Sequence, residues 1–222
     1  MRQLYLPMRV WDLAIRFFHW AIVALLLFSW GTAQWNRMDL HKISGYTILT
    51  LLLFRIVWGI IGSDTARFNR FLKSPVAAAR HLTHIHKREA DREIGHNAAG
   101  GWMVLGLLLL LLVQVLTGLA ANDDVSTEGP YAEFVGKSWS DWASKIHIQA
   151  FTIIEIAVVL HVLAVLAYAV LKRQDLIGPM ITGKKRLPGN TRAPRMRSPV
   201  LAFVLMLISA GLVTALVQFA PR

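Results

Sequence analysis

The sequence contains no cysteine among its 222 residues. This absence excludes disulfide bonds, cysteine-ligated iron–sulfur clusters and the attachment of haem through a C-x-x-C-H motif. Any metal cofactor must therefore be held by other ligands and by packing. No internal repeat and no low-complexity tract stands out.

Acidic residues are also few, because 13 Asp and Glu stand against 24 Lys and Arg, which gives a net charge of +11. A pI near 10.6 often indicates nucleic-acid binding. Here the mean hydropathy is +0.47, and the apolar residues come in long blocks. A hydrocarbon core of about 30 Å needs about 20 such residues in a helix. The sequence therefore predicts membrane helices at about 12–33, 43–62, 98–120, 148–171 and 198–219.

These blocks are rich in Leu, Ala and Val without period-two alternation, so we expect helices and no barrel. The first block has a short apolar stretch and is followed by a poor cleavage site, Thr32-Ala33-Gln34. We therefore expect it to be a membrane helix and not a cleaved signal peptide.

The distribution of basic residues predicts the orientation. Segments 1–16, 63–97 and 172–197 fall on one side of the membrane and carry 18 of the 24 Lys and Arg. By the positive-inside rule that side is cytoplasmic, which puts the N-terminus inside and the C-terminus outside. The positive charge then reflects orientation and contact with anionic lipid, and nucleic acid is not an expected partner. The basic, Pro/Gly-rich segment 183–199 is interpreted as a flexible linker, and 121–146 as an outer loop.

Four histidines lie in or at the edges of the predicted spans, at His19, His41, His147 and His161. Ionisable groups in membrane helices are rare and often functional. His147 and His161 lie 14 residues apart on one helix. That spacing puts them on nearly the same face, ~21 Å apart along the axis. One helix thus offers ligands at two depths.

Depth also selects the partners. His19 and His161 both fall in the inner half of the membrane, and His41 and His147 both fall near the outer surface. Two haem groups are therefore predicted, one between each pair. A packed, hydrogen-bonding histidine is the alternative for each residue taken singly.

Other charged groups lie within the predicted spans. Arg16 lies one turn before His19, and Arg55 lies 14 residues beyond His41. Both would bind haem propionates or, alternatively, reach lipid phosphates. Glu155, in the middle of the fourth span, is interpreted as a neutral acid bonded to another helix, or as a proton relay.

At these positions the sequence resembles the bacterial cytochrome b561 family and the cytochrome b subunits of nickel–iron hydrogenases. The matching stretches include Val10-Trp11-Asp12, Arg16-Phe17-Phe18-His19-Trp20, His41-Lys42-Ile43-Ser44-Gly45-Tyr46, Phe54 to Ser63, Gly95-His96-Asn97 and Ile181 to Lys185. The resemblance covers residues 8–186, a predicted di-haem transmembrane bundle. Residues 187–222 are predicted to form a basic linker and an extra membrane helix.

The resemblance implies an all-α, four-helix membrane bundle with two b haems, and ligands at His19, His41, His147 and His161. It implies a respiratory-chain role in the bacterial inner membrane. Electrons would pass between the quinone pool and a redox partner. The quinone would be ubiquinone or menaquinone, and the partner a periplasmic c-type cytochrome, another redox protein or superoxide. An anchor subunit of a larger dehydrogenase or hydrogenase is the alternative, and a haem-free proton-coupled transporter is an alternative of another class.

Two features depart from the family pattern. Relatives often carry an acid directly after the histidine that matches His147, and this chain has Ile148. The fifth span carries no histidine, so we expect it to lie outside the haem-binding bundle and to contact lipid or a partner.

Overall fold

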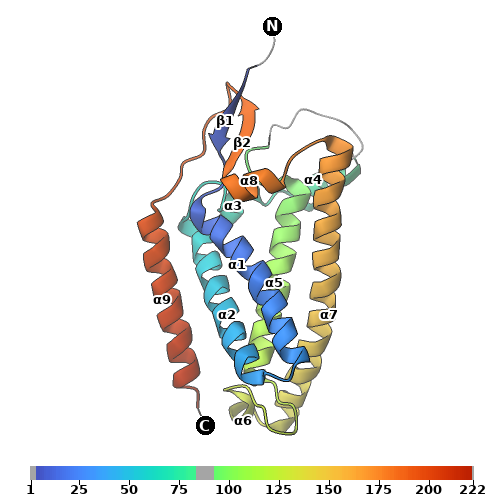
Figure 1. Ribbon diagram of the computed structural model, residues 1–222, viewed down its shortest axis with the longest axis vertical. Coiled ribbons are helices and arrows are strands. Elements are labelled where there is room, and N and C mark those ends of the chain that lie inside the picture. The colour runs from blue at the N-terminus through green and yellow to red at the C-terminus, as the bar shows by residue number, and fades with distance from the viewer. Residues whose placement is uncertain (1–3, 84–92, 222) are drawn as a thin grey trace. The chain divides into compact units, whose positions relative to one another are not determined.

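The computed structural model describes residues 4–83 and 93–221. In this part of the chain, five helices are long and apolar enough to cross a membrane. The predicted all-α membrane fold is confirmed (Figure 1). The five are α1 (Leu13–Gln34), α2 (Met38–Ile61), α5 (Ala98–Ala120), α7 (Lys137–Ala167, continued by the π-helical turn Tyr168–Lys172) and α9 (Pro199–Gln218).

The predicted outer loop 121–146 is wrong over most of its length. It contains the short helix α6 (Ala132–Val135), and α7 begins at Lys137, well before the predicted start at 148. Hydropathy marks where a helix enters lipid, whereas its hydrogen bonds begin wherever the backbone turns helical. Trp139 and Trp142, whose ring centres lie 5.9 Å apart, are therefore on a helix and not in a loop.

Side-chain caps fix where the first and third long helices begin. The carboxylate of Asp12 accepts a 2.7 Å hydrogen bond from the backbone N–H of Ile15, and the amide oxygen of Asn97 accepts one of 2.7 Å from Gly100. Each bond satisfies an N–H group that has no partner inside its helix. The turn between α1 and α2 is tight, with Asn36 at a φ of 52°.

The chain divides into two compact units, and each of the five long helices contributes residues to both. The first unit comprises Met1–Phe17, Ile56–Gly106 and Val158–Ala202. The second comprises Phe18–Arg55, Leu107–Ala157 and Phe203–Arg222.

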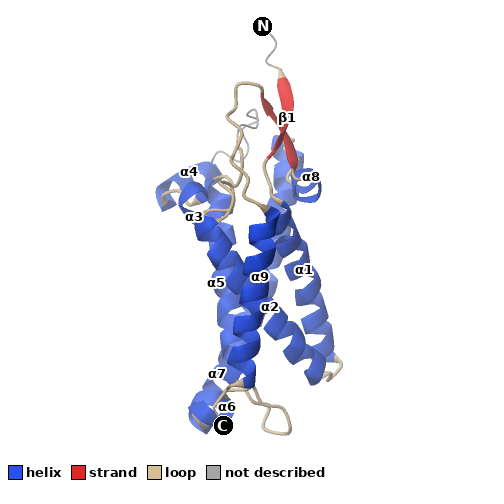
Figure 2. Cartoon of the chain, turned by 90° about the vertical axis from the view of Figure 1, so that its left-hand side faces the viewer, coloured by secondary structure: helices blue, strands red, loops and turns tan. Residues whose placement is uncertain are grey.

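In the first unit, a two-stranded antiparallel sheet forms between β1 (Tyr5–Arg9) and β2 (Lys184–Pro188), drawn red in Figure 2. Tyr5 pairs with Pro188 and Arg9 with Lys184. The interpretation of 183–199 as a flexible linker is therefore wrong for its first part. The strands are short and far apart in sequence, and local periodicity does not reveal such a pairing. β2 runs two residues past 186, the predicted end of the di-haem bundle. The domain boundary at that residue stays a prediction.

The predicted inner loop 63–97 contains α3 (Phe68–Phe71) and α4 (Pro75–Thr83). His81 on α4 is hydrogen-bonded to the hydroxyl of Tyr168 at 2.6 Å, with the two rings stacked at 13°. His81 is therefore packed against another side chain. His84 and His86 lie outside the described residues.

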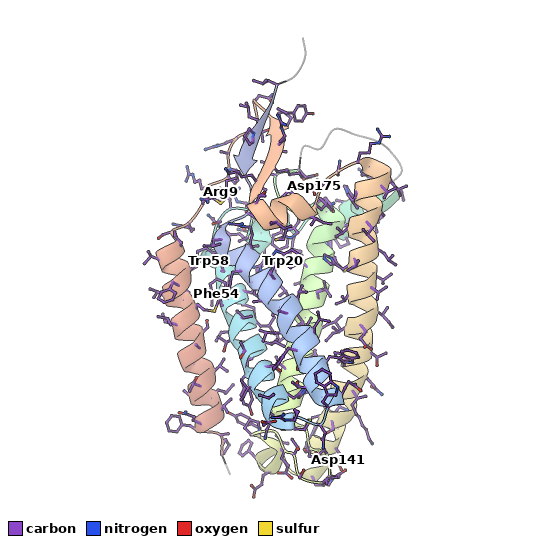
Figure 3. All side chains as sticks on the ribbon, in the orientation of Figure 1. Arg9, Trp20, Phe54, Trp58, Asp141 and Asp175 are labelled. Carbon is purple, nitrogen blue, oxygen red and sulfur yellow. The ribbon has the colours of Figure 1, made fainter. Side chains whose placement is uncertain are left out.

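The motif residues Val10-Trp11-Asp12 and Trp58 meet in the core of the first unit (Trp58 is labelled in Figure 3). The indole N–H of Trp58, 1% exposed, donates to the second carboxylate oxygen of Asp12 at 3.0 Å. The hydroxyl of Thr65 donates to the carbonyl of Val10 at 2.6 Å. The role of these residues is thus to join the segment before α1 to the end of α2.

Helix α9 buries one narrow stripe, Ala202, Ser209 and Val213, and the rest of its surface is mostly exposed. In the second unit, the hydroxyl of Tyr131 donates to the carbonyl of Leu216 on this helix at 2.9 Å. The exposed face is apolar, as in a helix that faces lipid or a partner.

Candidate haem site

In the second unit, His41 of α2 and His147 of α7 face each other. Their ring centres lie 6.1 Å apart, and the ring planes cross at 83°. Both side chains are partly buried. The structure thus brings together the two histidines that their predicted depth had paired.

The ring of His41 is oriented by α1. Its Nδ1 lies 2.9 Å from the carbonyl oxygen of Ser29 and 3.1 Å from the Ser29 hydroxyl. Because a carbonyl oxygen can only accept, Nδ1 carries the hydrogen. The lone pair of the neutral imidazole is then on Nε2, the nitrogen left for a metal ion.

The ring of His147 is oriented in the same way by α5. Its Nδ1 donates to the carbonyl oxygen of Gln114 at 2.8 Å, which again leaves the lone pair on Nε2. The side-chain amide of Gln114 lies 3.0 Å from this Nε2 and donates to it. The Gln114 amide therefore lies on the side of the ring to which the Nε2 lone pair is directed.

Glycines on two helices shape the surroundings of these rings. A Cβ atom at Gly118 would lie only 2.9 Å from Cε1 of His147. The backbone of α5 can therefore lie this close to the ring only because residue 118 is a glycine. A Cβ atom at Gly45, one turn after His41, would meet no atom within 4 Å. One side of the site is thus tightly packed, and open space lies beside the other.

The donor set and its spacing fit a haem. With metal–imidazole bonds of about 2 Å, two imidazoles on opposite sides of one iron have ring centres about 6 Å apart. Ligating histidines usually donate their other ring N–H to a carbonyl or carboxylate, and both do so here.

The other two predicted ligands are His19, on α1 with Ser29, and His161, on α7 with His147. His19 belongs to α1 and to the second unit, where its ring contacts that of Trp20 edge-on at 4.9 Å. His161 belongs to α7 and to the first unit, and is partly buried. Their pairing remains a prediction.

The two arginines predicted to bind the cofactor differ in their surroundings. In the first unit, a guanidinium nitrogen of Arg16 on α1 donates to the carbonyl of Ile181 on α8 (Ile177–Thr182). The Nε atom of Arg16 is buried and has no hydrogen-bond partner among the described residues. In the second unit, Arg55 is 2% exposed. A side chain that reached lipid phosphates would be far more exposed, so burial favours an internal anion for Arg55.

Glu155 does not bond to another helix within the described residues. Its side chain is exposed on α7, midway along the span. The interpretation as a neutral acid bonded to another helix is therefore wrong, because the side chain is exposed and makes no such bond in the described part of the chain.

Sequence reasoning missed Ser29, Gln114 and Gly118. For Ser29 the functional atoms include a backbone carbonyl, which any residue type supplies. Gln114 had a visible signal, because it is the one amide in the Leu-rich span 98–120. A polar side chain at such a position usually has a specific partner.

Comparison with protein-family models gives a match to prokaryotic cytochrome b561 over residues 10–183, well over half of the chain. Comparisons with curated proteins and with solved structures gave no significant match. The matched range contains all four predicted ligands, the capping residue Asp12 and the first four of the five long helices. The chain therefore belongs to the prokaryotic cytochrome b561 family, and is a multi-pass membrane b-type cytochrome that binds haem b and acts in electron transfer.

Proposed function

We propose that this cytochrome holds two b haems, an outer one between His41 and His147 and an inner one between His19 and His161. It passes electrons between the quinone pool and a periplasmic or membrane redox partner in the respiratory chain of the bacterial inner membrane. The observation that carries the proposal is the facing pair His41–His147, with both Nδ1 atoms bound to backbone carbonyls.

The protein's own part in this function is to bind and orient. The carbonyls of Ser29 and Gln114 hold the imidazoles in the tautomer that leaves Nε2 available. Such bonds also raise the basicity of the ligand. The haem iron supplies the one-electron chemistry. Arg55, buried on the helix that carries His41, supplies a fixed positive charge for a propionate.

The inner haem is supported by the helix that both sites share. His147 and His161 lie on α7, which is regular between them. At 1.5 Å per residue the two levels lie ~21 Å apart along the helix axis. An electron that enters at one level can leave at the other, so the protein connects two depths of the membrane. The basic segments favour a cytoplasmic N-terminus and an outer C-terminus.

The test is a haem count on the purified protein. We expect two haems per chain by extraction of the cofactor, sharp low-spin b-type bands on reduction, and reduction of both by a soluble quinol. One haem per chain would contradict the inner site. A colourless preparation made with ample cofactor supply would exclude the whole proposal and favour the haem-free transporter.

Gly118→Ala tests the packing behind His147. The added methyl would lie 2.9 Å from the ring, so the imidazole or α5 must shift. Overpacking of this kind costs about 1–3 kcal/mol. We expect one haem to be retained at least about fivefold more weakly, with a shifted absorption band, and the second haem to be unchanged. This is measured by competition with apomyoglobin.

Gly106→Ala, on the same helix, is the matched control, because its Cβ meets no atom within 4 Å. It should leave both haems as they are. Equal loss from the two variants would mean that helix propensity, and not contact with His147, sets the effect.

A further inference from the structure

A basic cavity of about 570 Å³ lies in the first unit, apart from the haem ligands. Its walls come from the segment after α2, from α3, from the segment before α5 and from the linker before α9. Its charged lining residues are five cations and two carboxylates: Arg67, Arg70, Lys73, Arg192, Arg195, Asp64 and Glu93.

The carboxylate of Asp64 is already engaged. It accepts hydrogen bonds from the side chain of Arg67 and from the backbone N–H of Arg195, both at 2.9 Å. The N–H of Arg195 and the charges of Arg67 and Arg70 hold the pKa of Asp64 below its usual value. Asp64 therefore remains ionised, but its oxygens are occupied by the walls of the cavity.

Three of the cations have no such partner. In residues 4–83 and 93–221, Arg70, Lys73 and Arg192 form no ion pair. Three positive groups around one cavity repel one another unless an anion lies between them. The cavity thus has the charge of an anion site.

The walls are fixed by hydrogen bonds and ring packing. The backbone N–H of Asp64 donates to the carbonyl of Arg195 at 3.0 Å, and that of Arg197 donates to the Ser63 hydroxyl at 3.0 Å. The His96 ring packs against Phe71 at 4.8 Å. These contacts join the linker and α3 to the rest of the unit, so the cavity is preformed.

The depth of the cavity identifies the anion. It is lined by residues that follow the end of α2 and precede the start of α5, which is the level of the lipid headgroups. Trp102, whose indole N–H donates to the carbonyl of Lys73 at 3.0 Å, has the position of an interfacial tryptophan. Basic pockets at this level bind anionic headgroups.

We propose that this cavity binds the phosphate headgroup of an anionic phospholipid. Arg70, Lys73 and Arg192 contact the phosphate, while Arg67 and Arg195 keep the walls in place. A bound lipid would connect the linker before α9, through Arg192, to α3, through Arg70.

Native mass spectrometry of the intact holoprotein, titrated with phosphatidylglycerol, tests the proposal. We expect one tightly bound lipid in the wild type and none at the same concentration of phosphatidylcholine. Each cation near a headgroup contributes about fivefold to affinity, so Arg70→Gln with Arg192→Gln should weaken binding by at least about tenfold.

The matched control is Lys184→Gln with Arg186→Gln, which removes the same charge from exposed positions on β2 outside the cavity. It should change affinity by less than about twofold, because it leaves all cavity cations in place. Equal weakening by both double variants would show diffuse attraction and overturn the proposal, as would weakening by neither. Both should keep the wild-type haem spectrum and melting temperature.

A soluble competitor separates the two sources of phosphate. Millimolar pyrophosphate should not displace the lipid from the wild type, because the acyl chains add to its affinity. Full displacement would assign the cavity to a soluble phosphorylated anion and overturn the lipid assignment.

Discussion

Replacing His41 with alanine is expected to leave the protein with one haem per chain in place of two. The substitution would remove one of the two histidines proposed to hold the outer haem, and a methyl group cannot bind iron. His147→Ala should remove the same haem, because the two rings face each other at 6.1 Å. Haem extraction and difference spectra of the purified variants measure this directly.

The pairing is tested by comparing single and double variants. His41→Ala with His147→Ala should lose no more haem than either alone, since both residues serve one site. His19→Ala and His161→Ala should each lose the other haem, with the opposite band remaining. Combining His41→Ala with His19→Ala should then give a colourless protein.

His81→Ala is the matched control, because this histidine packs on Tyr168 and is not a predicted ligand. Two haems should remain in it. If His41→Ala and His147→Ala lost different haems, the ligand pairs would be wrong although the protein still bound haem.

The pairing of His41 with His147 was accessible from sequence because it depends on depth. Hydropathy places the membrane-embedded part of each helix, and 1.5 Å per residue then gives the level of each side chain. Two imidazoles at one level of a small bundle have few other partners. No knowledge of helix order around the bundle was required.

The groups that orient these imidazoles were not accessible. The carbonyls of Ser29 and Gln114 belong to the backbone, and only the three-dimensional packing of α1 and α5 brings them to a histidine. The β1–β2 pair was missed for a related reason, since Tyr5 and Pro188 are distant in sequence and each strand is only 5 residues long. Contacts of this kind depend on tertiary structure and leave no local pattern.

The motif that identifies the family is largely structural. Asp12 precedes α1 and would be taken from sequence as a capping residue. The structure adds the bond from Trp58, which explains why an acid, with two accepting oxygens, occupies the position. One carboxylate thus fixes the start of one membrane helix and the end of the next.

Asp12→Ala is therefore expected to be strongly destabilising. It removes the cap from the Ile15 N–H and leaves the buried indole N–H of Trp58 without an acceptor. A lost cap costs about 1 kcal/mol, and an unsatisfied buried donor about 1–3 kcal/mol. We expect the free energy of unfolding to fall by about 2–4 kcal/mol, measured by circular dichroism during titration with sodium dodecyl sulfate.

Asp12→Asn separates the two contributions. Asparagine caps helices as well as aspartate does, but its amide would place a donor opposite the indole N–H. It should lose the contribution of Trp58 alone and be intermediate in stability. The control is Asp39→Ala in the first turn of α2, where the carboxylate is 65% exposed and pairs with Arg37 at 3.6 Å. An exposed pair contributes at most about 1 kcal/mol, so a loss at Asp39 equal to that at Asp12 would show that burial and the bond to Trp58 are not the cause.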